Sequence, residues 1–264
     1  MQSYILWKGC LLFLVSVKLI YMLQSIFKIK GNAKLTDDVY KMTLSGDTSH
    51  ITKPGQFVNI KLDGFYLRRP ISVYDCQDGL LTIIYKVVGK GTEYMATLEE
   101  GTELDVLTGL GNGFDVEKCG NKVMLIGGGV GVPPMYYLAK CLIEAGKQVT
   151  MVMGFNKQSE IFAKQDFENL GIKTLVTTVD GSYGIKGFVT AAFDEVEYDS
   201  FCTCGPEPML KAVYDSTNTS GFFSFEERMG CGFGACMGCS CKTKYGNKRI
   251  CKDGPVLEKE EIIW

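Results

Sequence analysis

The sequence predicts an antiparallel β-barrel, then a doubly wound α/β domain, then a small cysteine-rich segment. Residues 25–114 are short apolar runs separated by Gly, Asp and Pro, with almost no helical periodicity, which is typical of a small barrel. Residues 122–204 alternate apolar strands with amphipathic helices, which predicts a parallel sheet with helices on both faces. Beyond Ser220 the chain is too short for a core of its own, so we expect a metal to hold it together.

The individual elements follow from the same pattern. The expected barrel strands are 25–29, 39–44, 56–60, 71–74, 80–87 and 103–107, with one short helix at 93–98. In the α/β domain we expect strands at 122–126, 149–154, 173–179 and 200–204, and helices at 133–145, at 160–169 and from 188 to 193.

Composition excludes several classes of protein. The chain has 264 residues, 46% of them hydrophobic and 22% charged, which is ordinary for a globular protein. Its 28 basic and 30 acidic residues nearly cancel, so we do not expect a nucleic-acid binder. Five of the 11 cysteines fall between Cys231 and Cys251, which indicates a metal site rather than a disulfide framework. The other cysteines lie mainly in apolar surroundings and favour a reducing, cytoplasmic compartment.

The N-terminus is apolar up to Phe27, which raises the alternative of a membrane anchor. The central Lys18 costs roughly 2.5 to 3.5 kcal/mol on insertion scales, which offsets the apolar residues around it. We therefore favour an N-terminal extension outside the fold, with Met22 as a possible start.

The strongest motif is the cysteine run. Cys231, Cys236 and Cys239, followed by Cys251, have the C-x4-C-x2-C…C spacing of plant-type [2Fe–2S] sites. The glycines between them permit the backbone angles that aim N–H groups at sulfur. A zinc knuckle is the alternative, although zinc sites commonly pair two C-x2-C hooks. Cys241 is surplus to this spacing, and we expect it to be a spectator.

Two signals indicate a flavin dinucleotide. Arg69 and Ser72 lie at the mouth of a barrel strand, where a guanidinium can bind a diphosphate and a hydroxyl can reach the flavin. Gly89–Thr92 follows the next strand and opens a short helix, which offers a second set of N–H groups to an anion. An ordinary solvated turn is the alternative for the first signal.

Three further segments lie where strands of the parallel sheet end. Gly127, Gly128, Gly129 and Gly131 form a turn between a strand and a helix, where backbone can approach a pyrophosphate, although Pro134 departs from G-x-G-x-x-G. Cys204, Gly205 and Pro206 end the last strand and leave room for nicotinamide. Residues 180–182 either reach an adenosine ribose or form a plain turn.

Together, Arg69–Ser72, the glycine turn, Cys204–Pro206 and the cysteine run resemble the ferredoxin–NADP reductase superfamily and, within it, the electron-transfer subunits of type B dihydroorotate dehydrogenases. The resemblance covers residues 25–264. It implies an extension at 1–24, an FAD-binding barrel at 25–117, an NAD-binding domain at 118–220 and a [2Fe–2S] domain at 221–264. The FAD contacts it implies are Arg69, Pro70, Ile71, Ser72, Ile84, Tyr85, Lys86, Gly91 and Thr92.

The function implied by the resemblance is electron transfer in pyrimidine biosynthesis. Electrons from a partner FMN-containing dihydroorotate dehydrogenase catalytic subunit would pass through the cluster and FAD to NAD, within a hetero-oligomer such as a heterotetramer. No acid–base catalytic residue is needed, and we interpret His50 as a surface residue. NAD rather than NADP is expected by resemblance alone, since Gly154–Lys157 contains no acidic residue.

Two alternatives stay open. The same combination of FAD and a [2Fe–2S] cluster could belong to a subunit of another NAD(P)H-dependent oxidoreductase, of the ferredoxin oxidoreductase or sulfhydrogenase type. A non-enzymatic metal-binding or membrane-associated scaffold is the alternative from another class.

Overall fold

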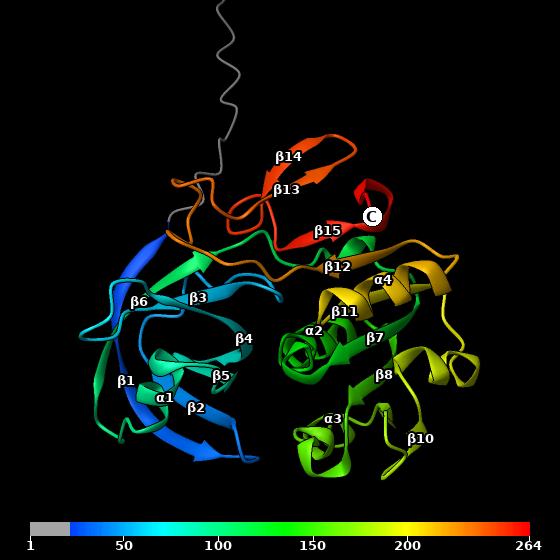
Figure 1. Ribbon diagram of the computed structural model, residues 1–264, viewed down its shortest axis with the longest axis horizontal. Helices are drawn as coiled ribbons and strands as arrows, with labels where there is room; N and C mark the ends of the chain where they lie inside the picture. The colour runs from blue at the N-terminus through cyan, green and yellow to red at the C-terminus, as the bar shows by residue number, and fades with distance from the viewer. Residues whose placement is uncertain (1–21) are drawn as a thin grey trace, which may run out of the picture.

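The computed structural model describes residues 22–264 and places a closed barrel beside a seven-stranded sheet (Figure 1). The expectations for an N-terminal extension at 1–24 and for a membrane anchor fall mostly on residues 1–21, outside the described part of the chain. The end of the extension is wrong, because Leu23 and Gln24 belong to the first barrel strand and pair with Thr108 and Leu107. Within residues 22–264, no helix is long and apolar enough to cross a membrane.

The barrel is confirmed, and all of its strand pairs are antiparallel. Its strands, in the order β1-β2-β5-β4-β3-β6, are β1 (Leu23–Lys34), β2 (Val39–Ser45), β5 (Leu80–Lys86), β4 (Arg69–Gln77), β3 (Phe57–Ile60) and β6 (Glu103–Leu110). Phe27 and Ile29 of β1 point into the barrel core, while Lys28 and Lys30 between and beyond them face solvent. The expected short helix is α1 (Lys90–Ala96), which follows β5.

The α/β domain is also confirmed as a doubly wound parallel sheet. Its strands, in spatial order, are β10 (Ile185–Lys186), β9 (Lys173–Thr178), β8 (Gln148–Phe155), β7 (Lys122–Gly128), β11 (Ser200–Cys204), β12 (Gly221–Ser224) and β15 (Val256–Glu258). Every pair is parallel except β12 with β15. Helix α2 (Pro133–Glu144) covers the face toward the barrel, and α4 (Glu207–Ser216) packs on the other face (Figure 1).

Two expected helices are wrong in detail. The helix expected at 160–169 is divided into a 3-10 turn, Gln158–Glu160, and the helix α3 (Lys164–Asn169). Ala163 between them has φ +58°, a left-handed angle that an α-helix cannot contain. The helix expected at 188–193 is a 3-10 helix, η4 (Val189–Glu195).

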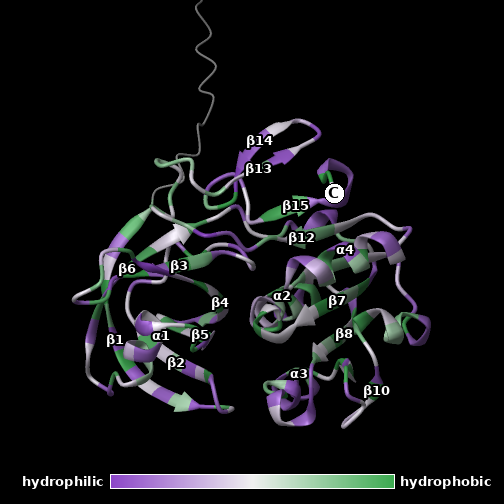
Figure 2. Cartoon of the chain, in the orientation of Figure 1, coloured by the Kyte–Doolittle hydropathy of each residue, from purple (hydrophilic) through white to green (hydrophobic). Residues whose placement is uncertain are grey.

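The last 44 residues contribute to the large sheet as well as to the cysteine loop. Strands β12 and β15 extend the sheet beyond β11, and the segment between them carries the loop and a hairpin of β13 (Ser240–Thr243) and β14 (Gly246–Arg249). Figure 2 shows that this hairpin is mainly hydrophilic. The remaining elements are the 3-10 helices Val116–Lys118, Gly129–Gly131 and Lys259–Glu261.

Three apolar clusters hold these parts together. One fills the barrel. The second lies between the sheet and α2 and includes Tyr74 and Ile84 of the barrel. The third, on the opposite sheet face, joins α4 and η4 to the buried side of the cysteine segment, Cys239 and Cys251 included. Apolar contacts therefore connect the barrel, the sheet and the cysteine segment into one body.

Candidate redox site

Three of the predicted cluster cysteines, Cys231, Cys236 and Cys239, lie on one loop, and Cys251 lies in the turn that follows the β13–β14 hairpin. Cys239 and Cys251 are each only 2% exposed, whereas Cys231 is half-buried and Cys236 is exposed. The loop turns sharply between them, with left-handed angles at Gly232 (φ +79°), Gly234 (φ +92°) and Met237 (φ +60°). A group held by these thiols would have one side against the protein core and the other toward solvent.

Backbone N–H groups point at two of the sulfurs. The N–H groups of Ala235 and Cys236 donate to Cys231 Sγ at 3.2 and 3.4 Å, and that of Cys251 donates to Cys239 Sγ at 3.4 Å. Burial works to raise the pKa of Cys231, but the hydrogen bonds from the Cys236 and Phe233 backbone outweigh it and lower this pKa to about 6. The loop therefore stabilises a thiolate before any metal is added.

The donor set fits an iron–sulfur cluster by its chemistry. Such a cluster requires four thiols and N–H groups aimed at sulfur, and the loop together with the turn after β14 supplies both. Within residues 22–264, however, no three His, Cys, Asp or Glu side chains converge closely enough to hold a metal ion. Cys241 lies in β13, opposite Lys248.

The cysteine loop rests on barrel strand β3. The Asn59 side-chain Nδ2 donates to the carbonyl oxygen of Cys231 at 3.3 Å, and a Cβ added to Gly232 would lie 2.3 Å from that nitrogen. Asn59 pairs with Pro70 across β3 and β4, and Phe57 pairs with Ser72. Strand β3 therefore pairs with the predicted flavin strand β4 and, through the Asn59 side chain, also contacts the cysteine loop.

The two adjacent arginines of the flavin motif have different surroundings. The Arg68 guanidinium donates to both carboxylate oxygens of Asp105 at 3.0 Å and to the Asn59 backbone carbonyl at 3.3 Å. Arg69 has no acidic partner among the described residues. Its guanidinium donates to the Leu67 carbonyl, lies over the Phe65 ring, 5.0 Å from its centroid, and packs against Gly91. Arg69 is therefore the arginine left available for an anionic ligand.

The other predicted FAD residues are placed around this strand. Tyr85 is buried, its hydroxyl donates to Asn32 at 3.0 Å and its ring stacks on Tyr40, so its side chain belongs to the barrel core. Lys86 forms an ion pair with Asp38. Thr92 Oγ1 accepts from the Val88 N–H at 2.9 Å and donates to the Gly89 carbonyl at 3.0 Å, which closes the start of α1.

The structure brings the predicted dinucleotide residues together at one edge of the sheet. Gly127 of β7 pairs with Cys204 of β11, and a Cβ on Gly131 would lie 2.1 Å from the Cys204 carbonyl oxygen. A Cβ on Gly128 would lie 2.4 Å from the Met209 Sδ, whereas Gly129 has no atom within 4 Å, so the turn is close-packed at Gly128 and Gly131. Burial raises the pKa of the Cys204 thiol to about 12. This edge is therefore small, close-packed and uncharged at Cys204.

Residues 180–182 lie beside a second part of the same edge. Ser182 Oγ donates to Asp180 Oδ1 at 2.6 Å and accepts from the Gln158 N–H at 2.8 Å. With Lys157 and Ser159 these residues line a hollow of about 510 Å³ at the ends of β8 and β9. The Ser182 side chain therefore holds this segment in a turn, and the turn borders the hollow.

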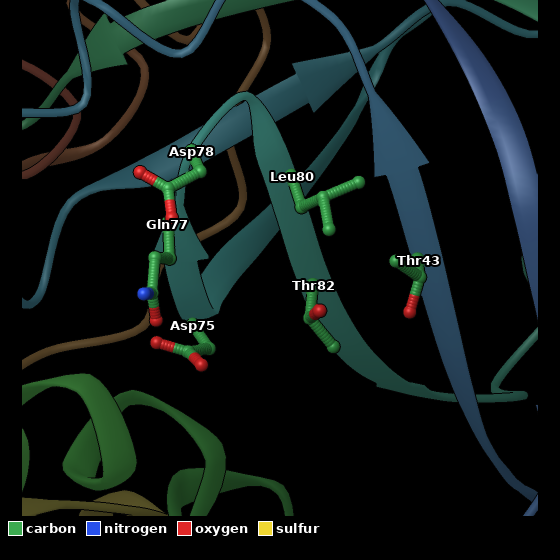
Figure 3. Close-up of a pocket in the computed structure, with 6 residues that line it drawn as sticks. All are labelled: Thr43, Asp75, Gln77, Asp78, Leu80 and Thr82. Atoms are coloured by element: carbon green, nitrogen blue, oxygen red, sulfur yellow. The ribbon is translucent and has the colours of Figure 1, made fainter.

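A second hollow, of about 320 Å³, lies away from every predicted site residue. Thr43, Asp75, Gln77, Asp78, Leu80 and Thr82 line it on barrel strands β2, β4 and β5 and the turn between the last two (Figure 3). The Asp75 carboxylate is already paired with Lys140 of α2 at 2.7 Å. His50, expected at the surface, is half-buried and lies close enough to Asp47 to lower that carboxyl's pKa slightly, after the larger effect of Ser49.

Sequence reasoning did not find the contact between the barrel and the α/β domain. The Tyr74 hydroxyl donates to Asp166 of α3 at 2.5 Å, and Lys41 pairs with the same carboxylate at 3.1 Å. The Tyr74 ring stacks on Tyr136 of α2 with centroids 4.5 Å apart. No local sequence signal marks these residues, because their partners are 62 to 125 positions away.

The order of a barrel, a parallel NAD-type sheet and a cysteine loop is that of ferredoxin reductase-like oxidoreductases. Residues 125–215 match the oxidoreductase NAD-binding domain, and residues 226–263 match the iron-sulfur cluster binding domain of dihydroorotate dehydrogenase B. The chain belongs to the family of dihydroorotate dehydrogenase B (NAD(+)) electron transfer subunits. It is 42% identical to the subunits from Fusobacterium nucleatum, over 89% of this chain and 96% of that one, and from Shouchella clausii, over 91% and 98%.

Solved structures agree with the fold. An NADH-dependent reduced ferredoxin-NADP oxidoreductase superposes with a TM-score of 0.82 at 32% identity, over 91% of this chain and 90% of that one. A ferredoxin NADP+ reductase from Neisseria gonorrhoeae, solved with FAD and NADP, has a TM-score of 0.65 at 15% identity, over 73% and 89%, and shows the fold alone.

Proposed function

We propose that this chain is the electron-transfer subunit of an NAD-dependent dihydroorotate dehydrogenase in pyrimidine biosynthesis. It would accept electrons from a partner FMN-containing catalytic subunit and deliver them to NAD. The observation that carries the proposal is the contact of the cysteine loop with β3, the strand that pairs with the flavin motif of β4. That contact sets two candidate redox sites side by side.

We assign the ligands from the surroundings of each residue. Cys231, Cys236, Cys239 and Cys251 would hold a [2Fe–2S] cluster, with the N–H groups of Ala235, Cys236 and Cys251 donating to sulfur. Arg69 would bind the FAD diphosphate, because its neighbour Arg68 is already bound to Asp105. The remaining FAD contacts, which rest on the family resemblance, would be Pro70, Ile71, Ser72, Ile84, Tyr85, Lys86, Gly91 and Thr92, with Tyr85 contributing backbone atoms because its side chain is buried in the barrel.

NAD would bind at the edge where β7 and β11 end. The glycine turn allows backbone to approach a pyrophosphate, and Cys204–Pro206 beside it leaves a small, uncharged surface for nicotinamide. When bound, a cluster transfers single electrons, FAD stores one or two, and NAD accepts a hydride. The chain's own residues would therefore bind and orient these groups and exclude water, and no acid–base residue is assigned.

The partner would dock where the loop is exposed. Cys236 is exposed, and Phe233 and Met237 beside it are 42% and 55% exposed. Exposed apolar side chains around a redox loop are suited to a hetero-oligomeric interface. We also propose the cytoplasm, since the described cysteines are free thiols and a reducing compartment keeps them so.

The test is anaerobic purification of the chain alone and with the FMN subunit encoded by the same organism. We expect bound FAD with about two irons and two sulfides per chain, and dihydroorotate-dependent NAD reduction only when both subunits are present. Zinc without flavin would contradict the proposal.

A second function is favoured by one observation. The 32% identical structure over 91% of the chain is an NADH-dependent reduced ferredoxin-NADP oxidoreductase. If reduced ferredoxin, and not the FMN subunit, supplies electrons to the purified chain, the protein serves that type of complex instead.

A further inference from the structure

We propose that Asn59 is a positioning residue that holds the cysteine loop on the barrel and sets the reduction potential of the cluster. The inference rests on the proposed function, since it requires a cluster on the loop. It concerns a barrel residue that lies outside both the flavin motif and the cysteine run.

The first observation is the close fit between Asn59 and the loop. Asn59 is 1% exposed, and its Nδ2 donates to the Cys231 carbonyl at 3.3 Å across 172 positions of sequence. Gly232 packs so closely on the same amide that a Cβ would lie 2.3 Å from Nδ2. The peptide group between Cys231 and Gly232 is therefore held by Asn59 from one side.

The second observation is that Asn59 is itself held firmly. Its backbone pairs with Pro70 of β4, and its carbonyl accepts from Arg68, whose guanidinium is fixed by two hydrogen bonds to Asp105. A chain of contacts thus runs from Asp105 through Arg68 and Asn59 to the first cysteine of the loop. One residue connects the proposed flavin strand to the proposed cluster.

The third observation concerns the oxygen of the Asn59 side-chain amide. Asn59 Oδ1 is buried and accepts no hydrogen bond from any described residue. The amide therefore acts on the loop as a donor. Since hydrogen bonds and charge near the sulfurs tune an iron–sulfur potential, a change of this donor should change the potential, and a negative charge in its place should change it more.

The experiment is a redox titration of the purified FAD- and cluster-containing protein, followed by electron paramagnetic resonance. Asn59→Leu removes the donor at similar size, and Asn59→Asp adds a charge. The matched control is Gln56→Met, because Gln56 is also a buried amide, 4% exposed, but bonds Thr52, Lys53 and Gly111 rather than the loop. FAD and iron content are measured on every variant.

We expect Asn59→Asp to make cluster reduction at least tenfold less favourable, which is 59 mV for one electron. Asn59→Leu should shift the potential in the same direction by less, and Gln56→Met should leave it unchanged. If the Asn59 variants lose iron but keep FAD, while Gln56→Met keeps both, the positioning role is supported.

Two results would overturn the inference. One is an unaltered potential in cluster-containing Asn59→Asp and Asn59→Leu. The other is a loss of FAD and iron together in the Asn59 variants and equally in Gln56→Met, which would show a general barrel defect. A wild-type protein without any iron–sulfur cluster would instead contradict the proposed function, so the two failures are distinguishable.

Discussion

At the scale of single residues, the site depends on how closely backbone and side chains approach. Gly232 has a left-handed φ of +79°, and a Cβ added to it would lie 2.3 Å from Asn59 Nδ2. We expect Gly232→Ala to lose more than half of the bound iron, because strain of about 1–2 kcal/mol is added to a collision with a buried amide. Iron per chain measures this. The control is Gly64→Ala, which has φ +80° but no atom within 4 Å and should keep its iron.

Substitution of Arg68 and of Arg69 should have different effects. Arg69→Ala should lower FAD occupancy at least tenfold with little change in the melting temperature of the apoprotein. Arg68→Ala should lower the free energy of unfolding by about 1.5–3 kcal/mol, the usual value of a hydrogen bond to a charged group, because it leaves the Asp105 carboxylate without a cation and bonded only to Gln24. Flavin content and denaturant unfolding separate the two effects, and equal loss of stability in both variants would contradict the assignment.

Cys204 provides a pH-dependent test. Burial raises its pKa from 9 to about 12, so the reactive thiolate should be on the order of 10³ rarer at pH 8 than in an unfolded chain. Alkylation, followed by mass spectrometry, should accelerate tenfold per pH unit well beyond pH 9, whereas the urea-unfolded chain levels off near 9. The unfolded state ionises first, so the stability that this neutral thiol contributes is fully present below about pH 9 and is lost progressively as the pH rises to about 12, without recovery above it. A plateau near pH 9 in the folded protein would contradict the raised pKa.

At the scale of elements, local pattern was sufficient for some segments and not for others. The barrel strands and β7, β8 and β9 were predicted because each is an apolar run between turn residues. Helix α4 was missed although Leu210 and Val213 have helical spacing, because Pro206, its N-cap residue, was interpreted as part of a ligand loop. Strands β12 and β15 are only 4 and 3 residues long and pair with each other from 32 positions apart or more, which no local periodicity reveals.

The site shows the same division. The cysteine spacing and the glycine turn are local, so they were found from sequence. Asn59, Tyr74 and Asp166 were not, since each acts through a partner far along the chain. A buried asparagine in a strand carries no signal until its neighbour is known.

The contact between β4 and α3 is an element-scale prediction. Tyr74→Phe keeps the ring stacked on Tyr136 but removes the hydrogen bond to Asp166, so we expect a loss of about 1.5–3 kcal/mol in unfolding free energy. In a double-mutant cycle, Asp166→Ala should cost much less in the Tyr74→Phe background than in wild type. Additive effects would show that the two side chains do not interact.

At the scale of the whole molecule, the cysteine segment is part of the α/β domain's structure as well as a carrier of ligands. Residues 221–264 begin with β12 and return as β15, so the large sheet is completed by the same segment that forms the loop. Phe223 of β12 is fully buried, and its ring meets Phe201 edge-on at 5.4 Å. Loss of this segment therefore removes core from the sheet, not only cysteines.

This arrangement separates two ways of removing the cluster. Truncation after Ser220 should destabilise the α/β domain by at least about 3 kcal/mol, since a buried phenylalanine contributes about 1.5–3 kcal/mol and β12 contains two, Phe222 and Phe223. Cys236→Ser should remove only the cluster, because Cys236 is exposed, and FAD should stay bound and reducible by NADH. Thermal melting by circular dichroism and flavin content measure both variants. A truncated chain that melts like wild type and still oxidises NADH would show that the last 44 residues are an independent module, against the continuous sheet through β11, β12 and β15.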